Sequence, residues 1–397
     1  MTILEQTKIY EKELIEIRNH LHEHPELSTK EYETLEFIKN KLKDYQIEYI
    51  EVEDGGILGF LENGTNQNTL LLRADMDALP IQENEKNLNR NKTVVSKNPG
   101  VAHACGHDSH TAMLLIAAKI LKQNLDKING KIILCFERAE EVGGGIRNLL
   151  DYFDKKELRI DGCFGLHVNP QLKTGFLSVN PGPVMAGACG FEVKIIGKDG
   201  HGSRPDIANN PLDCFVAIYN ALNMIRLKYI SPLEKLTVSV AKISGGTRGN
   251  IIEKEFVFGG SARFFKEEIG IKFREEFLNI LENMTKAYHC NYSNASLFIG
   301  SPVINDHYLS NLARESITRN LGQEYVTSSE PYMGSESMSW YLKRYPGVFG
   351  FLGIKNEEYG SGADLHNEFF DIDTAALKNG VTATVGYALK FLDEVRG

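Results

Sequence analysis

Two near-continuous apolar segments of strand length constrain the fold of this chain more than any other feature. They cover residues 131–136 and 162–167, and helical segments alternate with strand-like runs around them. Such runs, alternating with helices, are typical of parallel strands that are buried on both faces of a sheet. The sequence therefore predicts an α/β domain with a mixed, mostly parallel sheet flanked by helices.

Further elements of this domain follow from the same kind of pattern. Apolar residues at helical spacing predict helices, and shorter apolar runs predict strands. The predicted helices cover residues 10–21, 31–43 and 111–121, and the predicted strands cover residues 57–61, 69–73 and 348–352. Pro25 ends the first helix, because proline cannot continue a helix interior.

From about Gly187 the pattern changes to half-buried strands and longer amphipathic helices. The predicted elements are a strand at residues 190–196, a helix at 211–225, strands at 235–244 and 255–265, a helix at 266–287 and a strand at 296–299. The order βαββαβ predicts a ferredoxin-like α+β unit. A chain of 397 residues exceeds the usual size of one core, and helix–strand alternation resumes after residue 300. We therefore expect residues 187–300 to be inserted into a domain formed by residues 1–186 and 301–397.

Charge and composition exclude several classes of function. A net charge of −9 without a Lys/Arg cluster disfavours nucleic-acid binding. The residues after Met1 lack the apolar core of a secretory signal, and no run of roughly 18 apolar residues occurs, so we expect neither secretion nor a membrane span. The six cysteines are widely spread without paired spacing, which is typical of a protein in the reducing cytoplasm.

Residues 103–110 concentrate three histidines, one cysteine and one aspartate. Asp108 and Ser109 are residue types that cap a helix start, so we expect this cluster on a loop that leads into the apolar helix. Cys105 and His107 can face one metal ion; thiolate and imidazole suit Zn²⁺, and added carboxylates widen the choice towards Mn²⁺. Alternatively, Cys105 is a small buried hydrophobic residue and the histidines satisfy local hydrogen bonds.

Polar residues at the ends of three predicted strands favour the metal interpretation. They are Asp75 and Asp77 after the first strand, Glu140 and Glu141 after the second, and His167 at the end of the third. In open α/β sheets the functional site lies outside the carboxyl ends of the strands. The sequence therefore predicts a metal site where these residues meet Cys105 and His107.

Other polar residues are expected to have structural roles. His20, His22 and His24 fall at the end of a helix, where we expect them to be solvated or to interact favourably with its C-terminus. The polar segment 83–100 is expected to be an exposed loop. We expect His110, near the start of the apolar helix, to be a structural residue on a helix face.

Six ordered motifs resemble those of a known family along nearly the whole chain. They are residues 73–80 (RADMDALP), 103–108 (HACGHD), 139–141 (AEE), 165–167 (GLH), 200–205 (GHGSRP) and 365–367 (LHN). Together they resemble the aminoacylase/carboxypeptidase-type co-catalytic metallopeptidase family. The branch is that of the N-acyl-amino-acid amidohydrolases, which includes hippurate hydrolases, indole-acetyl-amino-acid hydrolases and N-acetyl-diaminopimelate deacetylase. The resemblance implies a catalytic metal-binding domain and an inserted lid domain through which a homodimer can form.

The resemblance also implies two divalent metal ions per subunit, zinc or manganese, with cobalt or nickel as alternatives. The implied metal ligands are Cys105, His107, Glu141, His167 and His366, with Cys105 as the bridge between the ions. Asp75 and Asp77 would orient a ligand histidine. The implied reaction is hydrolysis of the amide bond of a small N-acyl-L-amino acid by metal-activated water.

Further catalytic roles follow from the matching motif positions. Glu140 is the implied general base, His201 the implied donor to the oxyanion, and Asn250 and Arg263 the implied ligands of the substrate carboxylate. Neighbouring side chains on an extended segment point to opposite sides, which supports separate roles for Glu140 and Glu141.

The sequence departs from the family pattern at Glu137, Arg138, Arg248 and Ser337, which puts pocket details and acyl preference in doubt. Within the enzyme interpretation, a dipeptidase- or aminopeptidase-like activity and a dedicated N-acetyl-diaminopimelate deacetylase stay open. A non-catalytic metal-binding relative is disfavoured because the base and all five ligand candidates are present. No Gly-x-Ser-x-Gly and no His-Glu-x-x-His occurs, which excludes a serine hydrolase of that type and a zincin.

Overall fold

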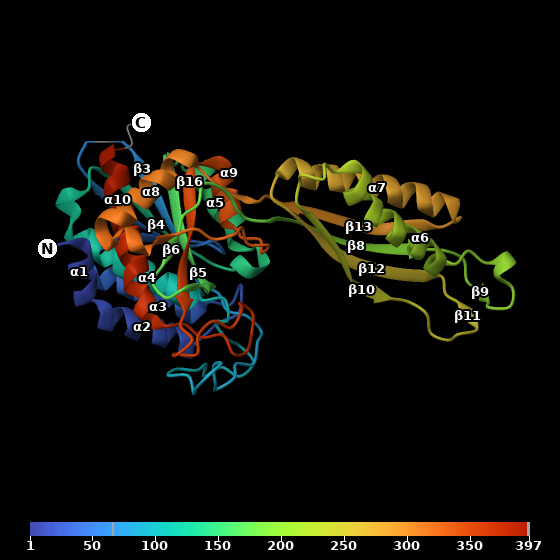
Figure 1. Ribbon diagram of the computed structural model, residues 1–397, viewed down its shortest axis with the longest axis horizontal. Coiled ribbons are helices and arrows are strands. Elements are labelled where there is room, and N and C mark those ends of the chain that lie inside the picture. Colours follow the sequence, from blue (N-terminus) through green and yellow to red (C-terminus); the bar gives the residue numbers. More distant parts are fainter. Residues whose placement is uncertain (66, 395–397) are drawn as a thin grey trace. The chain divides into compact units, whose positions relative to one another are not determined.

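The computed structural model describes residues 1–65 and 67–394 (Figure 1). The chain divides into two compact units. The first consists of Met1–Gly182, Ile304–Glu330 and the chain from Trp340, and the second of Pro183–Val303 and Pro331–Ser339. The sequence placed the short segment Pro331–Ser339 with the first domain, whereas its contacts place it in the second unit.

An eight-stranded mixed sheet forms the centre of the first unit, in the order β1-β2-β4-β3-β5-β16-β6-β15. The strands are β1 (Glu48–Val52), β2 (Gly56–Asn63), β3 (Thr69–Asp75), β4 (Gly130–Glu137), β5 (Gly162–Lys173), β6 (Leu177–Ser178), β15 (Val326–Thr327) and β16 (Gly347–Lys355). The four central strands β4, β3, β5 and β16 are parallel. The predicted mostly parallel sheet is therefore confirmed, and its strands β3, β4 and β16 are buried along nearly their whole length, as the apolar runs indicate.

Helices cover both faces of this sheet. They are α1 (Ile3–Ile9), α2 (Glu11–Glu23), α3 (Tyr32–Asp44), α4 (His107–Gln123), α5 (Gly145–Lys155), α8 (His307–Leu321), α9 (Met338–Arg344) and α10 (Leu377–Glu394). Leu70 and Leu72 of β3 belong to one core with residues of α4 and α10. On the other face, the ring of Phe153 in α5 lies 6.3 Å from that of Tyr341 in α9, whose hydroxyl is 3.6 Å from Cys135 Sγ on β4.

The second unit contains a four-stranded antiparallel sheet in the order β10-β12-β8-β13. Its elements are β8 (Gly187–Ile196), α6 (Pro211–Met224), β10 (Leu236–Ser244), β12 (Glu255–Phe264), α7 (Glu267–Ala287) and β13 (Asn291–Gly300). Both helices lie on one face of the sheet (Figure 1), over a core that includes Phe191, Phe258 and Phe277. The predicted ferredoxin-like order βαββαβ is present.

Shorter strands complete the described structure. β9 (Gly200–His201) and β11 (Ile251–Ile252) pair as a small antiparallel ribbon that the sequence did not predict. β7 (Gly182–Met185) and β14 (Val303–Asn305) lie where the chain passes from one unit to the other. None of the described helices combines the length and the apolar composition that crossing a bilayer requires.

Candidate metal centre

The carboxyl ends of three parallel strands bring the first predicted residues together. Asp75 is the last residue of β3 and lies opposite Glu137, the last residue of β4. β5, paired in parallel with β3, extends past the same edge and carries His167. This edge is where open α/β sheets place their functional sites.

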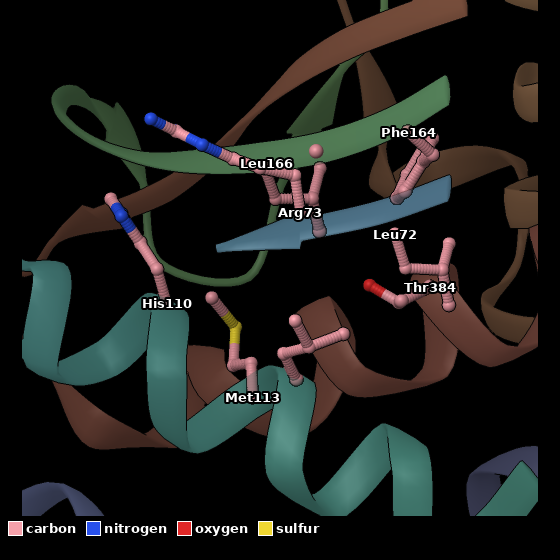
Figure 2. A pocket seen from close by; sticks show the side chains of 9 residues that line it. Leu72, Arg73, His110, Met113, Phe164, Leu166 and Thr384 are labelled. Carbon is pink, nitrogen blue, oxygen red and sulfur yellow. The ribbon is translucent and has the colours of Figure 1, made fainter. Parts of the chain in front are cut away.

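Asp75 docks the first turn of α4 onto this edge. Its Oδ1 atom lies 2.7 Å from His110 Nδ1, and its backbone carbonyl accepts a hydrogen bond of 2.7 Å from Thr111 Oγ1. His110 Nε2 accepts a hydrogen bond of 2.9 Å from the Val168 backbone N–H. Figure 2 shows His110 rising from α4 towards the strand that carries Arg73. Because both of its ring nitrogens are engaged, His110 is a structural link, as the sequence predicts.

The cavity drawn in Figure 2 lies between this turn and the sheet, and its volume is about 20 Å³. Leu72, Met113, Phe164 and Thr384 are among the residues that line it. A volume of this size accommodates about one water molecule. It is therefore a packing cavity and not a substrate site.

The five residues predicted as metal ligands converge at the same edge. Their ligand atoms form overlapping groups, and within each group all atoms lie within 4.8 Å of one another. The groups are Cys105 with His107 and His167, Cys105 with Glu141 and His366, and His107 with Glu140 and Glu141. Asp75, His107 and His110 form a further group, but both nitrogens of His110 are already used. These overlapping groups offer ligand atoms for more than one cation, and Cys105, His107 and Glu141 each belong to more than one group.

Two left-handed backbone positions bring these ligands together. Gly106 has φ +85°, and a Cβ atom there would lie 2.4 Å from Val168 Cγ2. Only glycine fits this turn without strain, and it separates Cys105 from His107, where α4 begins. His366 has φ 61°, and its backbone N–H donates a 2.8 Å hydrogen bond to the carbonyl of Ala104. The strain at His366 thus coincides with a contact that ties its loop to the cysteine loop.

Asp77 holds two of the predicted ligands at once. Its Oδ1 atom lies 3.1 Å from His107 Nδ1, while Oδ2 accepts hydrogen bonds from Ser28 Oγ at 2.7 Å and from the Glu141 backbone N–H at 3.1 Å. The contact at Nδ1 leaves His107 Nε2 facing the cluster. Asp77 therefore lies where a carboxylate orients a ligand histidine, whereas the histidine that is hydrogen-bonded to Asp75 is His110, which is not one of the predicted ligands.

Among the five predicted metal ligands, two buried side-chain atoms have no hydrogen-bond partner in the part of the chain that the structure describes. They are His107 Nε2 and Glu141 Oε1, which lie 3.8 Å apart. Glu141 Oε1 is also 3.3 Å from His366 Nε2, and Cys105 Sγ is 3.5 Å from His167 Nε2. Buried polar atoms are normally satisfied, so lone pairs of nitrogen, oxygen and sulfur that converge without donors fit divalent cations.

Burial and neighbouring charges shift the pKa values of the residues at this site. Burial raises the pKa of Asp75, but the charges of His107 and Arg73 outweigh it and hold this pKa well below its ordinary value. Burial lowers the pKa of His107, yet the Asp75 carboxylate raises it well above the ordinary value. Burial lowers the pKa of His167 strongly and raises that of the Cys105 thiol. His167 is thus neutral and can offer a nitrogen lone pair to a metal ion, whereas the Cys105 thiol needs a nearby cation to lose its proton.

The turn that carries Glu140 and Glu141 differs from the expectation. Glu140–Val142 form a 3₁₀ turn, and Ala139 before it has φ 53°. The segment is therefore not extended, and atoms of both carboxylates lie within 4.8 Å of His107. The prediction that the two side chains point to opposite sides is wrong, because the left-handed residue turns both towards the cluster.

A buried ion network behind the cluster was also not expected. Arg18 Nε lies 2.9 Å and His22 Nδ1 lies 2.7 Å from Asp108 Oδ2, and His22 Nε2 lies 2.9 Å from Glu83 Oε1. His22 is therefore buried and not solvated, and Asp108 is not a cap: α4 begins at His107, with Gly106 at the N-cap position. Positions 18 and 22 continue the i, i+4 spacing from the buried Leu14, which is the sequence signal for this network.

The segment 83–100 is likewise more than an exposed loop, because several of its residues are buried. Lys92 Nζ donates hydrogen bonds to Glu83 Oε1 at 2.9 Å and to the carbonyl of Glu368 at 3.0 Å. Asn87 Nδ2 donates to Asp371 Oδ2 at 2.9 Å. These contacts attach the segment to the loop that carries His366.

Glu137 and Arg138, the two residues before Ala139 that depart from the family pattern, both form ion pairs with other side chains. Glu137 Oε2 accepts hydrogen bonds from Arg73 Nε at 2.9 Å and from the Tyr341 hydroxyl at 3.1 Å. Arg73 Nη1 also donates to Asp75 Oδ2 at 2.7 Å, so Glu137 is linked to the residue that holds α4. Arg138 pairs with the buried Glu31 at 2.9 Å.

The remaining predicted residues lie in the second unit. His201 is on β9, and its Nδ1 atom accepts a 3.1 Å hydrogen bond from the Ser203 N–H, while the carbonyl of Asn250 accepts one of 2.8 Å from the Gly202 N–H. His201 on β9 is thus close to Asn250, the residue directly before β11. Arg263 on β12 donates to Ser335 Oγ at 3.1 Å. The departures Arg248 and Ser337 also lie here; Arg248 is exposed, and Ser337 is buried beside Glu336.

Comparisons with known proteins agree with this geometry. Residues 71–390 match the model of Peptidase family M20/M25/M40. N-acetyl-L-cysteine deacetylase of Bacillus subtilis (strain 168) is 34% identical, with 92% of this chain and 85% of that protein covered. IAA-amino acid hydrolase ILR1-like 4 of Arabidopsis thaliana is 31% identical, with 96% and 86% covered.

A solved Bacillus subtilis structure described as a dinuclear metal-binding peptidase of the M20 family is 28% identical, with a TM-score of 0.82, and covers 98% of this chain and 100% of that one. A structure from methicillin-resistant Staphylococcus aureus is 30% identical, with a TM-score of 0.88, and covers 98% and 99%. The resemblance inferred from the six motifs is thereby confirmed. This chain belongs to Peptidase family M20/M25/M40.

Proposed function

We propose that this hydrolase cleaves N-acyl-L-amino acids to a carboxylic acid and a free amino acid, using two divalent metal ions. The observation that carries the proposal is the convergence of one thiol, three imidazoles and two carboxylates around buried atoms without hydrogen-bond partners. Relatives named as an N-acetyl-L-cysteine deacetylase and an indole-acetyl-amino-acid hydrolase support metal-dependent hydrolysis of a small amide.

The residues that would hold the ions are Cys105, His107, Glu141, His167 and His366. The thiolate and the imidazoles favour zinc, and the carboxylates widen the choice towards manganese. When bound, the ions lower the pKa of the attacking water and polarise the amide carbonyl. Cys105 is the proposed bridging ligand; it belongs to two of the ligand groups, as Glu141 does, while His107 belongs to three.

Glu140 is the proposed general base. Its carboxylate reaches the group formed by His107 and Glu141, so it lies where it can take a proton from the attacking water and deliver one to the departing amine. Glu141 is held through its backbone N–H by Asp77, which supports its role as a fixed ligand.

Recognition of the substrate is assigned to the second unit. His201 is the proposed donor to the oxyanion, and Arg263, whose planar head suits a carboxylate, is proposed to bind the substrate's carboxyl group together with Asn250. α6 exposes Leu212, Val216 and Tyr219 at i, i+4 and i+7, with 47%, 50% and 46% of their surfaces accessible. Such an apolar stripe supports a homodimer through this unit. The six free, buried cysteines support a cytoplasmic location.

A substrate panel tests the proposal. Amine release is measured from N-acetyl-, N-benzoyl- and indole-acetyl-amino acids and from free dipeptides, with metal-stripped protein and protein reloaded with Zn²⁺ or Mn²⁺. Metal-dependent cleavage of acylated substrates is expected, and loss of cleavage in a Glu140→Gln protein that still binds two ions supports the base. Preference for free dipeptides would instead indicate a peptidase, and no turnover despite bound metal would indicate a non-catalytic relative.

A further inference from the structure

We propose that Glu31 and Arg138 form a clamp that positions the turn carrying Glu140 and Glu141. This inference rests on the proposed function, because it concerns the placement of the proposed base. Neither residue reaches the metal ligands directly. They act as positioning residues through the backbone at Ala139.

The clamp is built from four hydrogen bonds, two of which join it to the backbone of the exposed residue Thr29. Arg138 Nε donates to Glu31 Oε2 at 2.9 Å, and Arg138 Nη2 donates to the carbonyl of Thr29 at 2.9 Å. Glu31 Oε1 accepts hydrogen bonds from the Ala139 N–H at 2.8 Å and from the Thr29 N–H at 3.0 Å. The side chain of Glu31 is fully buried, and only 6% of the Arg138 side chain is exposed. A charge-assisted pair with both oxygens engaged is rigid, because either side chain would lose contacts by moving.

The backbone needs such support at this position. Ala139 has φ 53°, a left-handed conformation that an alanine adopts only when the surroundings hold it there. The Ala139 carbonyl accepts a 2.9 Å hydrogen bond from the Gly144 N–H, which closes the turn. Any relaxation of φ at Ala139 towards the right-handed region would swing the following peptide and both carboxylates away from the cluster.

Two carboxylates therefore hold two N–H groups in the same turn. Glu31 holds the N–H of Ala139, and Asp77 holds the N–H of Glu141 at 3.1 Å. Glu140 lies between these two fixed points and has its direction set by both. Arg138 supplies the positive charge that keeps the Glu31 carboxylate in place at its end of the turn.

The experiment compares Arg138→Met, Arg138→Lys and Arg159→Met in the full-length, metal-loaded enzyme. Arg159 is the matched control, because its ion pair with Asp161 leaves 56% of its side chain exposed at the other end of the sheet. The readouts are kcat and KM with the N-acetyl-amino acid that the wild type cleaves fastest, bound metal, and Tm. We expect Arg138→Met to lower kcat roughly 10- to 100-fold with little change in KM, since a misplacement of ~1 Å can cost about this much. Arg138→Lys should recover part of the loss, and Arg159→Met should behave as wild type.

A Glu140→Gln background separates positioning from general destabilisation. Because the clamp acts through Glu140, Arg138→Met should change the residual kcat of that background less than about twofold. An equal loss in both backgrounds would overturn the proposal, as would an Arg138→Met enzyme with wild-type kcat. If Glu140→Gln itself retains wild-type activity, the base assignment fails and not the clamp alone.

Discussion

Replacing Asp77 by Asn tests how the carboxylate at the sheet edge prepares the metal centre. Asp77 is buried, and although burial raises its pKa, hydrogen bonds from His107 and Ser28 hold this pKa below the ordinary value. Its oxygens contact His107 Nδ1 on one side and Ser28 Oγ and the Glu141 N–H on the other. Asn has one carbonyl oxygen and one amide group, so it can satisfy only one side.

The expected loss of metal affinity follows from the contact that the Asn side chain cannot make. If the amide N–H of Asn faces His107 Nδ1, the imidazole carries its proton on Nε2, the atom that faces the cluster. If it faces Glu141, two N–H groups oppose each other and the turn moves. Loss of such a carboxylate partner costs about 10- to 100-fold in metal affinity, which equals about 1.4–2.8 kcal/mol.

The assay is a competitive titration of Zn²⁺ and Mn²⁺ against a chromophoric chelator, with total metal content measured in parallel. Asp161→Asn is the control, because Asp161 also accepts a backbone N–H, that of Thr69 at 2.9 Å, but lies at the opposite end of the sheet. We expect Asp77→Asn to weaken at least one site tenfold and Asp161→Asn to leave both unchanged. Affinities for both ions within threefold of the wild type would refute the role of Asp77 in orienting His107.

Three further changes test the same structure. Gly106→Ala should destabilise the first unit by at least about 2 kcal/mol, because φ +85° and the 2.4 Å approach to Val168 both oppose a Cβ atom. Urea unfolding, followed by the fluorescence of the single tryptophan, measures this loss, and an unchanged midpoint would contradict the prediction. Burial raises the pKa of Glu83, but His22 and Lys92 lower it to about 2. The contacts of the Glu83 carboxylate with these two residues therefore stabilise the fold above the ordinary carboxyl pKa of 4.5, and this contribution is lost as the pH falls towards about 2. In metal-free protein the gap in stability between wild type and Glu83→Gln, at most about 3 kcal/mol at pH 7, should close over that range, and a pH-independent gap would argue against the linkage. Cys105→Ser should lose about one ion per subunit on desalting, because a hydroxyl does not ionise as a thiol does, and wild-type metal content would count against the bridge.

Many elements of both units were predictable, because buried strands and amphipathic helices have a characteristic local pattern of apolar residues. The apolar runs at 131–136 and 162–167 are central parallel strands, and the helical stripes are amphipathic helices at nearly the expected places. The candidate site followed from the rule that parallel strands end at one edge, which brought Asp75, His167 and the cysteine loop together before any contact was known.

The predictions that were wrong concern contacts between residues that lie far apart in the sequence. His22 was expected to be solvated because its partners, Glu83 and Asp108, lie 61 and 86 residues away in the chain. Glu140 and Glu141 were expected on opposite sides because the left-handed turn at Ala139 depends on Glu31, 108 residues away. No local pattern records a hydrogen bond between such distant positions.

The sequence by itself thus determined the central sheet, the order βαββαβ and the set of proposed metal ligands, since periodicity, spacing and motif are properties of the sequence alone. Only the tertiary structure decided the orientation of those side chains. Carboxylates from distant segments, Asp75, Asp77, Glu31 and Asp108, hold the ligand loops by contacts that form when the chain is folded. The chemistry of the centre is therefore a property of composition and motif, while its geometry is a property of long-range electrostatics.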